Sequence, residues 1–453
     1  MTHQGYSEPD SDQSITQSIE DKIEVLPLGR CTISKWHLPT SKSHLIRMVL
    51  IASQTNSEVK FVRIINPGED AFSMATCLQQ FGVEITFTDD YWKVVGVGSR
   101  GFTMPKDPLN CGNSGTSFQL LAGLCAGFTF PVTLDGDNNL RNRKNDGLWA
   151  PLKDAGVVIS YQNGGDSLPM TIQGPWEPQN VYINVSNSSQ PLSSLRFAAI
   201  SAPRPFKVIL EGNPVSRKHF ELSDSISRLS GSTNLISIDS DNFELKPWQP
   251  KLPSIVEIPS DASMASFAML FVKTHGTEIW LENWPQENDC IGNEILAHIS
   301  SQLGLKWVNE NNNIKISESS ESAEVITVDL RDSNDLITPL AAIMAQGSGG
   351  RIIGASHARL KESNRITKTV ELLSIFGIEV IAKDDGLEII GGQKPIKPKT
   401  MVSTFGDHRM QMTATVLGSK TGAVIQGSKL HEVSFPNFLQ ILQSAGVKFA
   451  QNR

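Results

Sequence analysis

A unit of roughly 73 residues recurs six times along this chain and constrains the fold more than any other sequence feature. In each copy a helical stretch ends at a glycine, and an alternating apolar strand with a polar turn follows. One such glycine is ordinary, because glycine adopts the left-handed C-cap easily. A near-constant period over six copies predicts repeated units of helices and hairpins, with turns such as 163–165 and 384–386. The glycines are Gly82, Gly156, Gly231, Gly304, Gly377 and Gly446, and their successive separations are 74, 75, 73, 73 and 69 residues.

The length of 453 residues exceeds what one hydrophobic core usually holds, so we expect two domains with three units each. The boundary should fall between the third and fourth glycines. Residues 248–266 contain three prolines there and lead into a helix that Asp261 or Ser263 would cap. A cleft between two such domains is a natural place for a ligand.

The composition limits the kinds of partner that this protein can bind. A net charge of −7 argues against nucleic acid, because no basic excess exists to neutralise a phosphate backbone. Five cysteines without metal spacing suit a reducing compartment. Residues 1–22 are polar and acidic, which predicts a disordered tail, and no apolar run is long enough to span a bilayer. We therefore expect a cytoplasmic monomer that binds small molecules and neither nucleic acid nor membrane.

The stretch LPTSKSHLIRM, residues 38–48, places hydroxyls and cations at the start of an apolar helix. Ser41 or Ser43 could cap that helix. Alternatively, the free amides of the first turn and the positive dipole end, together with Lys42 and Arg47, could hold an anion. Four other stretches repeat the pattern, and a cap or a solvated face explains each when it is taken alone. They are residues 110–124, 184–200, 357–366 and 405–417.

Taken together, these stretches predict a cleft that is lined by cations and amides and binds small anionic substrates. Asp335 and Glu362 stand among the cations, whose charge could tune a general base or acid. Patterns for competing chemistry are missing from the sequence: it contains no HExxH, no GxxxxGK[ST] and no GxSxG. We therefore predict no metal site and no ATP site of the P-loop class.

The order of these motifs resembles that of the enolpyruvyl transferases over about residues 23–450. This resemblance implies an α/β protein with a two-domain inverse α/β barrel-like fold, built from six βαβαββ units, three per domain, with the ligand cleft between the domains. Domain A would comprise residues 23–40 and 261–453, domain B residues 41–260, and the tail residues 1–22. The matching motifs are SKSxxxR (41–47), GNSGT (112–116), SSQ (188–190), DAS (261–263), Asp335, LKESNR (360–365), DHRM (407–410) and SFPNF (434–438).

By the same resemblance, the reaction would move the enolpyruvyl group of phosphoenolpyruvate to the 5-hydroxyl of shikimate 3-phosphate and release phosphate. This is a step of aromatic amino acid biosynthesis. It would proceed by addition and elimination through a tetrahedral intermediate, without metal or organic cofactor. The family is also the target of glyphosate, and Gly115 leaves room at the position where a side chain would crowd that inhibitor.

The resemblance also assigns residues to roles. Asp335 would take the hydroxyl proton and Glu362 would deliver a proton to the methylene carbon, and Lys42 or Lys361 could share that work. Phosphoenolpyruvate would meet Lys42, Gly115, Arg143, Gln190, Arg365 and Arg409. Shikimate 3-phosphate would meet Ser43, Arg47, Ser188, Ser189, Gln190, Ser216, Asp335, His357 and Lys361.

Several positions depart from the family pattern, mostly near the acceptor. They are Thr40, Gln119, His219, His357, Asn364 and Val433, and Arg143 lacks its usual following proline. Two alternatives therefore stay open. One is a related carboxyvinyl transferase that acts on another phosphorylated or acidic alcohol. The other is a non-catalytic paralogue that only binds a small anion.

Overall fold

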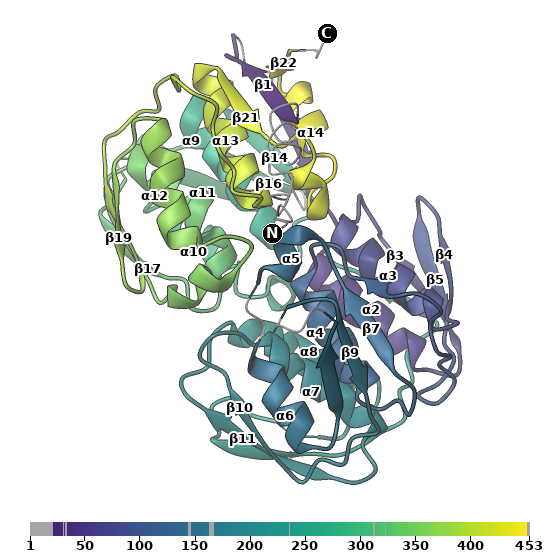
Figure 1. Cartoon of the computed structure of the whole chain (residues 1–453). Helices are drawn as coiled ribbons and strands as arrows, with labels where there is room; N and C mark the ends of the chain where they lie inside the picture. The colour runs from purple at the N-terminus through teal and green to yellow at the C-terminus, as the bar shows by residue number, and fades with distance from the viewer. Residues whose placement is uncertain are drawn as a thin grey trace, which may run out of the picture.

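Six small β-sheets and the helices that pack on them form two lobes (Figure 1). The computed structural model describes residues 21–450, apart from 30, 32–33, 144–145, 163–166, 235, 311–312 and 322. Buried apolar side chains form two separate cores. One runs from Leu45 to Ile258, and we call this part the first lobe. The other joins residues 23–38 to residues 264–447, and we call it the second lobe.

One unit of the second lobe shows the repeated plan completely. Two parallel strands are connected by a helix, and a second helix leads into an antiparallel hairpin that pairs with the second strand. This is the βαβαββ unit that the sequence predicts, and its hairpin turns at the expected Asp384 and Asp385. In chain order its elements are β17 (Ile326–Asp329), α11 (Ile337–Gln346), β18 (Gly349–Ile353), α12 (Arg365–Ile375), β19 (Val380–Lys383) and β20 (Gly386–Ile390).

The first lobe contains three sheets, with strand orders β13-β3-β5-β4, β6-β7-β9-β8 and β10-β11-β12. Its strands are β3 (Glu58–Val62), β4 (Glu84–Phe87), β5 (Tyr91–Val95), β6 (Leu109–Asn110), β7 (Val132–Asp135), β8 (Val158–Tyr161), β9 (Met170–Gln173), β10 (Asn180–Asn184), β11 (Phe206–Glu211), β12 (Asn242–Leu245) and β13 (Ile255–Glu257). Its helices are α2 (Lys42–Ser53), α3 (Glu69–Gln80), α4 (Gly115–Cys125), α5 (Asn138–Arg141), α6 (Trp149–Asp154), α7 (Gln190–Ala198) and α8 (Arg217–Leu229).

The second lobe adds sheets of order β15-β16-β14-β2 and β21-β1-β22. Their strands are β1 (Lys22–Leu26), β2 (Ser34–His37), β14 (Glu278–Glu282), β15 (Leu305–Glu310), β16 (Asn313–Glu318), β21 (Ala423–Gln426) and β22 (Lys448–Phe449). The accompanying helices are α9 (Ala265–His275), α10 (Ile295–Ile299), α13 (His408–Thr421) and α14 (Phe438–Ser444).

All six repeat glycines have positive φ angles, between 72° and 101°. The predicted left-handed helix stops are therefore confirmed, and so is the fold class. The third unit departs from the plan, since β12 is the one strand that follows Gly231 in the described part of that unit. The turn predicted at 163–165 lies outside the described residues.

Strands from distant parts of the chain complete two of the sheets. β13 runs parallel to β3, and β2 runs parallel to β14, so the strand that comes just before each crossing pairs with a strand distant in the sequence. The two crossings lie side by side, because Ser41 N donates to Pro259 O and Asp261 N donates to Pro39 O, both at 2.8 Å. The domain limits at 40/41 and 260/261 stay a prediction that is consistent with the two cores.

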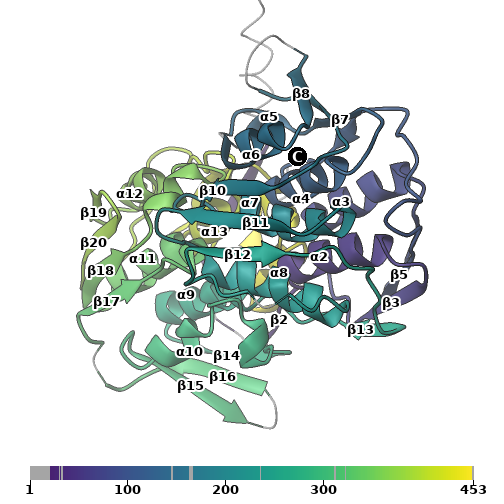
Figure 2. The same ribbon diagram turned by 90° about the horizontal axis from the view of Figure 1, so that it is seen from below.

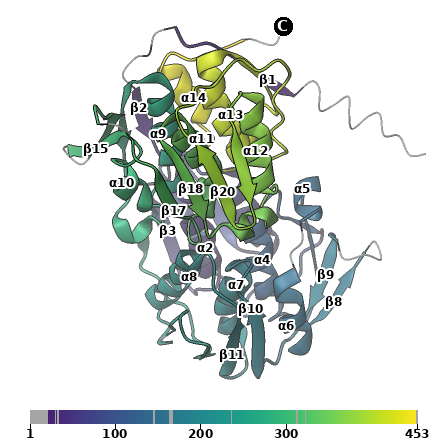
Figure 3. The same cartoon turned by 90° about the vertical axis from the view of Figure 1, so that its left-hand side faces the viewer.

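The sheets lie on the outside of each lobe and the helices lie within it (Figures 2 and 3). In the first lobe α4 contacts α7, and α7 contacts α8. Nearly every residue of α4 is buried, so this helix has no polar face like that of an amphipathic surface helix. Among the described helices, none combines the length and the apolarity that a bilayer crossing requires.

The predicted tail, residues 1–22, lies outside the described residues except for its last two. Lys22 begins β1. The Asp21 carboxylate accepts a hydrogen bond from Ser428 N at 2.8 Å. These two residues therefore belong to the folded second lobe.

Candidate active site

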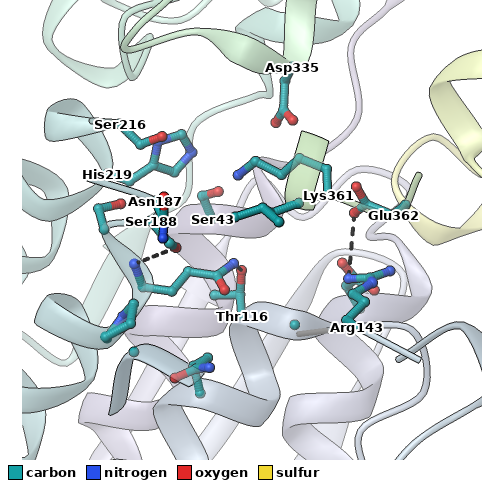
Figure 4. A pocket seen from close by; sticks show the side chains of 18 of the residues that line it. Ser43, Thr116, Arg143, Asn187, Ser188, Ser216, His219, Asp335, Lys361 and Glu362 are labelled. Carbon is teal, nitrogen blue, oxygen red and sulfur yellow. Dashed lines mark hydrogen bonds and ion pairs between the residues drawn. The ribbon is translucent and has the colours of Figure 1, made fainter. Parts of the chain in front are cut away.

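A cavity of about 280 Å³ lies between the two lobes and is lined by both (Figure 4). Asp335 points into it from the second lobe, and Lys361 extends across it towards Ser216 and His219. Arg143 and Glu362 face each other at the other end. The predicted site residues that line the cavity are Lys42, Ser43, Arg47, Gly115, Arg143, Ser188, Ser189, Gln190, Ser216, Asp335, Lys361 and Glu362.

Three predicted residues do not line it: His357, Arg365 and Arg409. All three are buried behind the wall, with side chains that touch groups lining the cavity or next to it. Their predicted contacts with substrate stay untested.

The start of α2 brings Lys42, Ser43 and Arg47 into the cavity. Ser41 occupies the N-cap position, but its hydroxyl makes no capping bond to the helix amides. It lies instead 2.9 Å from His44 Nδ1. The expectation that a serine hydroxyl caps this helix is therefore wrong, and the amides of its first turn lack that partner.

Arg47 and Lys361 are the cations best placed to hold an anion. Arg47 donates from Nε to Ser223 Oγ at 2.8 Å and from Nη1 to Ser43 O at 3.0 Å. Within the described part of the chain, neither cation has a carboxylate at ion-pair distance. Burial lowers the pKa of Arg47 to about 10 and also lowers the pKa of Lys361. A buried cation without an anion is costly, so a negatively charged ligand would relieve both groups.

Hydroxyl and amide groups surround this end of the cavity. Ser189 is the residue before α7, and Ser188 Oγ accepts from Gln190 N at 3.1 Å. Gln190 Nε2 donates in turn to Thr116 Oγ1 at 3.0 Å. This chain of bonds fixes the Gln190 side chain between the two ends of the cavity.

At the other end Arg143 is held in a fixed position. Its Nε donates to Asn139 Oδ1 at 2.9 Å, and its Nη2 bonds to Asn113 Oδ1. Its Nη1 lies 3.9 Å from Glu362 Oε1. Gly115 lies beside it, and a Cβ added there would come within 3.2 Å of Arg143 Nη1. The glycine therefore keeps the space in front of this guanidinium open.

Arg365 lies behind the cavity wall and forms ion pairs with three carboxylates. Its guanidinium lies 2.5 Å from Asp335, 2.7 Å from Glu362 and 2.8 Å from Asp407. Arg409 Nη2 lies 3.3 Å from the other oxygen of Asp335. The side chains of both arginines are 1% exposed. These bonds fix the two carboxylates that face the cavity.

The charges in the cavity set the protonation of its acids and bases. Burial would raise the pKa of Asp335, but Arg409, Arg365 and Lys361 outweigh it and hold that pKa well below its ordinary value. The pKa of Glu362 is likewise well below normal, because Arg365 and Arg143 overcome the effect of burial. Both carboxylates are therefore ionised at neutral pH in the empty cavity.

The basic groups divide into a charged lysine and neutral histidines. Burial lowers the pKa of Lys42, but Asp70 and the cavity carboxylates raise it by more than burial lowers it. The pKa is therefore above its ordinary value, and Lys42 is protonated. Burial lowers the pKa of both His219 and His408 to about 3, so these rings are neutral. In the described residues, no three His, Cys, Asp or Glu side chains are grouped as metal ligands.

Sequence reasoning missed several cavity residues. Asp70 is buried and lies 2.9 Å from Lys42 Nζ. It stands in the first turn of α3, where an acidic residue is ordinary because it complements the helix dipole. Its sequence position thus gives no separate signal. Thr116, within the GNSGT motif, and Asn187, directly before SSQ, also line the cavity.

Comparisons with known proteins identify the family of this chain. The family model described as EPSP synthase (3-phosphoshikimate 1-carboxyvinyltransferase) matches residues 34–442. The 3-phosphoshikimate 1-carboxyvinyltransferase of Caldicellulosiruptor saccharolyticus is 30% identical over 432 residues, which cover 90% of this chain and 96% of the relative. The enzyme of the same name from Lactococcus lactis is 30% identical over 420 residues, with 90% and 95% covered.

Solved structures share the fold. EPSP synthase from Acinetobacter baumannii superposes with a TM-score of 0.76 at 23% identity, covering 95% of this chain and 100% of that one. The enolpyruvyl transferase NikO from Streptomyces tendae gives a TM-score of 0.75 at 11% identity, with 95% and 99% covered. The match of the family model to most of the sequence and the relatives at 30% identity place this chain in the EPSP synthase family.

Proposed function

We propose that this protein transfers the enolpyruvyl group of phosphoenolpyruvate to the 5-hydroxyl of shikimate 3-phosphate and releases phosphate. The observation that carries the proposal is the two-ended cavity between the lobes. One end has Arg47 and Lys361, which have no carboxylate at ion-pair distance among the described residues. The other end has Arg143 and Glu362, and Asp335 faces the space between. Such a cavity suits two anionic substrates that meet at a pair of acid and base groups.

Shikimate 3-phosphate would occupy the end that holds Ser188, Ser216 and Lys361. Three hydroxyls, those of Ser188, Ser189 and Ser216, and the ammonium of Lys361 could all donate to the phosphate oxygens. Arg47 and Ser43 would then meet the carboxylate and the ring hydroxyls, and Gln190 would lie between the substrates. This placement gives each unpaired buried cation an anionic partner.

Phosphoenolpyruvate would occupy the end near Lys42, Gly115 and Arg143. Arg365 and Arg409 lie just behind and would reach it through small shifts of their side chains or act on it through their charge. The local cations then balance the added negative charge. Such electrostatic stabilisation usually supplies much of the rate enhancement in reactions of this kind.

Proton transfers follow from the charges. The ionised Asp335 accepts the proton of the 5-hydroxyl as that oxygen adds to C2 of phosphoenolpyruvate. Glu362 is ionised in the empty cavity, so it must gain a proton before it can protonate C3. The nearby anionic substrate raises its pKa, and the protonated Lys42 is a second donor. In the elimination step, the Glu362 carboxylate takes a proton from C3, the C2–C3 double bond re-forms, and phosphate leaves with the electron pair of the C2–O bond. Each such group typically contributes about 10²–10⁴-fold.

A coupled assay of phosphate release tests the proposal. Purified protein should release phosphate only when both substrates are present, and Lys361→Met should lose most of this activity. Arg359→Met is the matched control, because Arg359 does not line the cavity and bonds to the backbone of residues 383 and 384. Binding of phosphoenolpyruvate without turnover of shikimate 3-phosphate would instead favour a related transferase with another acceptor. His219 and Gln119, which line the cavity, are the observation that favours that second candidate.

Binding of inorganic phosphate by folded protein, without binding or turnover of the two substrates, would favour the non-catalytic paralogue. We also retain as proposals a monomeric state, a cytoplasmic location and the division of the chain into residues 23–40 with 261–453 and residues 41–260.

A further inference from the structure

Asn334 joins the two lobes at the edge of the cavity. Its side chain is 2% exposed, and its Nδ2 donates to Ser216 Oγ at 3.1 Å and to His357 Nε2 at 2.7 Å. Ser216 lines the cavity and belongs to the first lobe, whereas Asn334 and His357 belong to the second. His357 is itself 2% exposed and does not line the cavity.

The direction of these bonds decides what Ser216 can offer a ligand. The lone pair of an amide nitrogen is delocalised into the carbonyl and does not accept a hydrogen bond, so with Asn334 Nδ2 as donor His357 Nε2 accepts and the ring proton resides on Nδ1. Ser216 Oγ also accepts from this amide, which leaves its hydroxyl hydrogen available. Among the described residues, that hydroxyl caps no helix amide, although Ser216 precedes α8. The hydrogen can therefore point into the cavity and donate.

The opposite amide orientation would reverse this role. Asn334 Oδ1 would then accept the Ser216 hydroxyl hydrogen, and the serine would present lone pairs to the cavity. Lone pairs repel a phosphate oxygen. That orientation would require the other neutral tautomer of His357, with the ring proton on Nε2 donating to Asn334 Oδ1. Burial keeps His357 neutral by lowering its pKa to about 3.

We propose that Asn334 and His357 are positioning residues that orient the Ser216 hydroxyl as a donor to a phosphate oxygen in the cavity. This inference rests on the proposed function for the identity of the ligand as shikimate 3-phosphate. His357 then acts through Asn334 rather than by touching the substrate. The donor is also assembled only when the lobes meet, since Ser216 N donates to Arg331 O at 2.9 Å in the same contact.

The test is a double-mutant cycle on His357 and Ser216, read by calorimetric titration with shikimate 3-phosphate, shikimate and inorganic phosphate. His357→Leu keeps a similar volume but removes the acceptor, and Ser216→Ala removes the donor. We expect each to weaken binding of shikimate 3-phosphate about tenfold, the usual size for one hydrogen bond to a charged group. The double variant should also lose about tenfold rather than about a hundredfold, because both changes remove one interaction.

Two further readouts separate positioning from a general structural role. Binding of shikimate, which lacks the phosphate, should be the same in all four proteins. His357→Gln places a side-chain carbonyl near the position of Nε2 and should recover most of the affinity. Additive losses in the cycle, equal weakening for shikimate, or no recovery with glutamine would overturn the proposal.

Two further arrangements separate a folding defect, and a wrong assignment of the ligand, from a failure of this inference. If His357→Leu lowers the melting temperature too far for titration, Asn334→Ala replaces it in the same cycle. If wild-type protein binds inorganic phosphate but not shikimate 3-phosphate, the proposed function is wrong, and the cycle measured with phosphate still decides the role of His357. Binding of neither ligand would overturn both.

Discussion

Lys42 Nζ and Asp70 Oδ2 lie 2.9 Å apart in the wall of the cavity, and Asp70 is buried. The carboxylate fixes the lysine that begins α2 and helps to raise its pKa against the opposing effect of burial. Asp70 therefore holds Lys42 in place and keeps it charged for an anionic substrate.

Asp70→Asn should weaken this control of Lys42. We expect kcat/KM for phosphoenolpyruvate to fall, by up to about 10²-fold if the ammonium is displaced by about 1 Å. Activity that needs protonated Lys42 is lost as the pH rises through its pKa. Because the variant lowers that pKa, the alkaline limb of the pH profile should move to lower pH. Glu69→Gln, an exposed neighbour in the same helical turn, is the control, and an unmoved alkaline limb in Asp70→Asn would contradict the assignment.

Asp335→Asn tests the proposed base. The amide retains the shape of the carboxylate and one acceptor oxygen for the arginines, but it cannot take a proton. Turnover should fall about 10²–10⁴-fold while the variant still folds. Steady-state kinetics measures the turnover and thermal melting measures the folding. Asp384→Asn, at an exposed position, is the control. Wild-type turnover in a folded Asp335→Asn protein would remove Asp335 from the role of base.

The sequence predicts the repeat better than the way its strands pair. The six glycines fix where helices stop, because positive φ angles leave a local signature. No local pattern shows that β13 pairs with β3, since about two hundred residues separate them and the choice depends on how the crossings pack.

The same limit applies to the site. Lys42, Ser188 and Lys361 stand in motifs and line the cavity as expected. Arg365 was expected to face the substrate, yet three carboxylates hold it behind the wall. Which buried cations are already neutralised depends on tertiary contacts, so motif order could not separate Arg365 from Lys361. The link between Asn334 and Ser216 is hidden for the same reason.

Gly115→Ala should act selectively on phosphoenolpyruvate. The new methyl group would come 3.2 Å from Arg143 Nη1 and 3.7 Å from Gln190 Oε1, which is tight for the first contact. The end of an arginine can shift, so we expect the protein to fold. The displaced guanidinium should raise KM for phosphoenolpyruvate about tenfold, or ~1.4 kcal/mol, with little change in KM for shikimate 3-phosphate. Equal changes in both constants would contradict this division of the cavity.

Asp332→Asn should loosen the contact between the lobes. Arg217 in the first lobe donates to Asp332 from its backbone N at 2.8 Å and from its guanidinium Nη2 at 2.5 Å. Burial raises the pKa of Asp332, but the bonds from Arg217 outweigh this and lower it. The stabilisation of the contact is therefore present at neutral pH and is lost as the pH falls through that lowered pKa.

Because the pair is partly exposed, its loss should cost about 1 kcal/mol, which raises KM for shikimate 3-phosphate about fivefold. We expect kcat to stay unchanged, because bound substrate can draw the lobes together. Small-angle scattering without substrate should show a larger radius of gyration for Asp332→Asn than for wild type. Lys93→Gln is the control, because Lys93 pairs with Glu58 inside the first lobe. Unchanged scattering and unchanged KM in Asp332→Asn would show that this pair does not hold the lobes together.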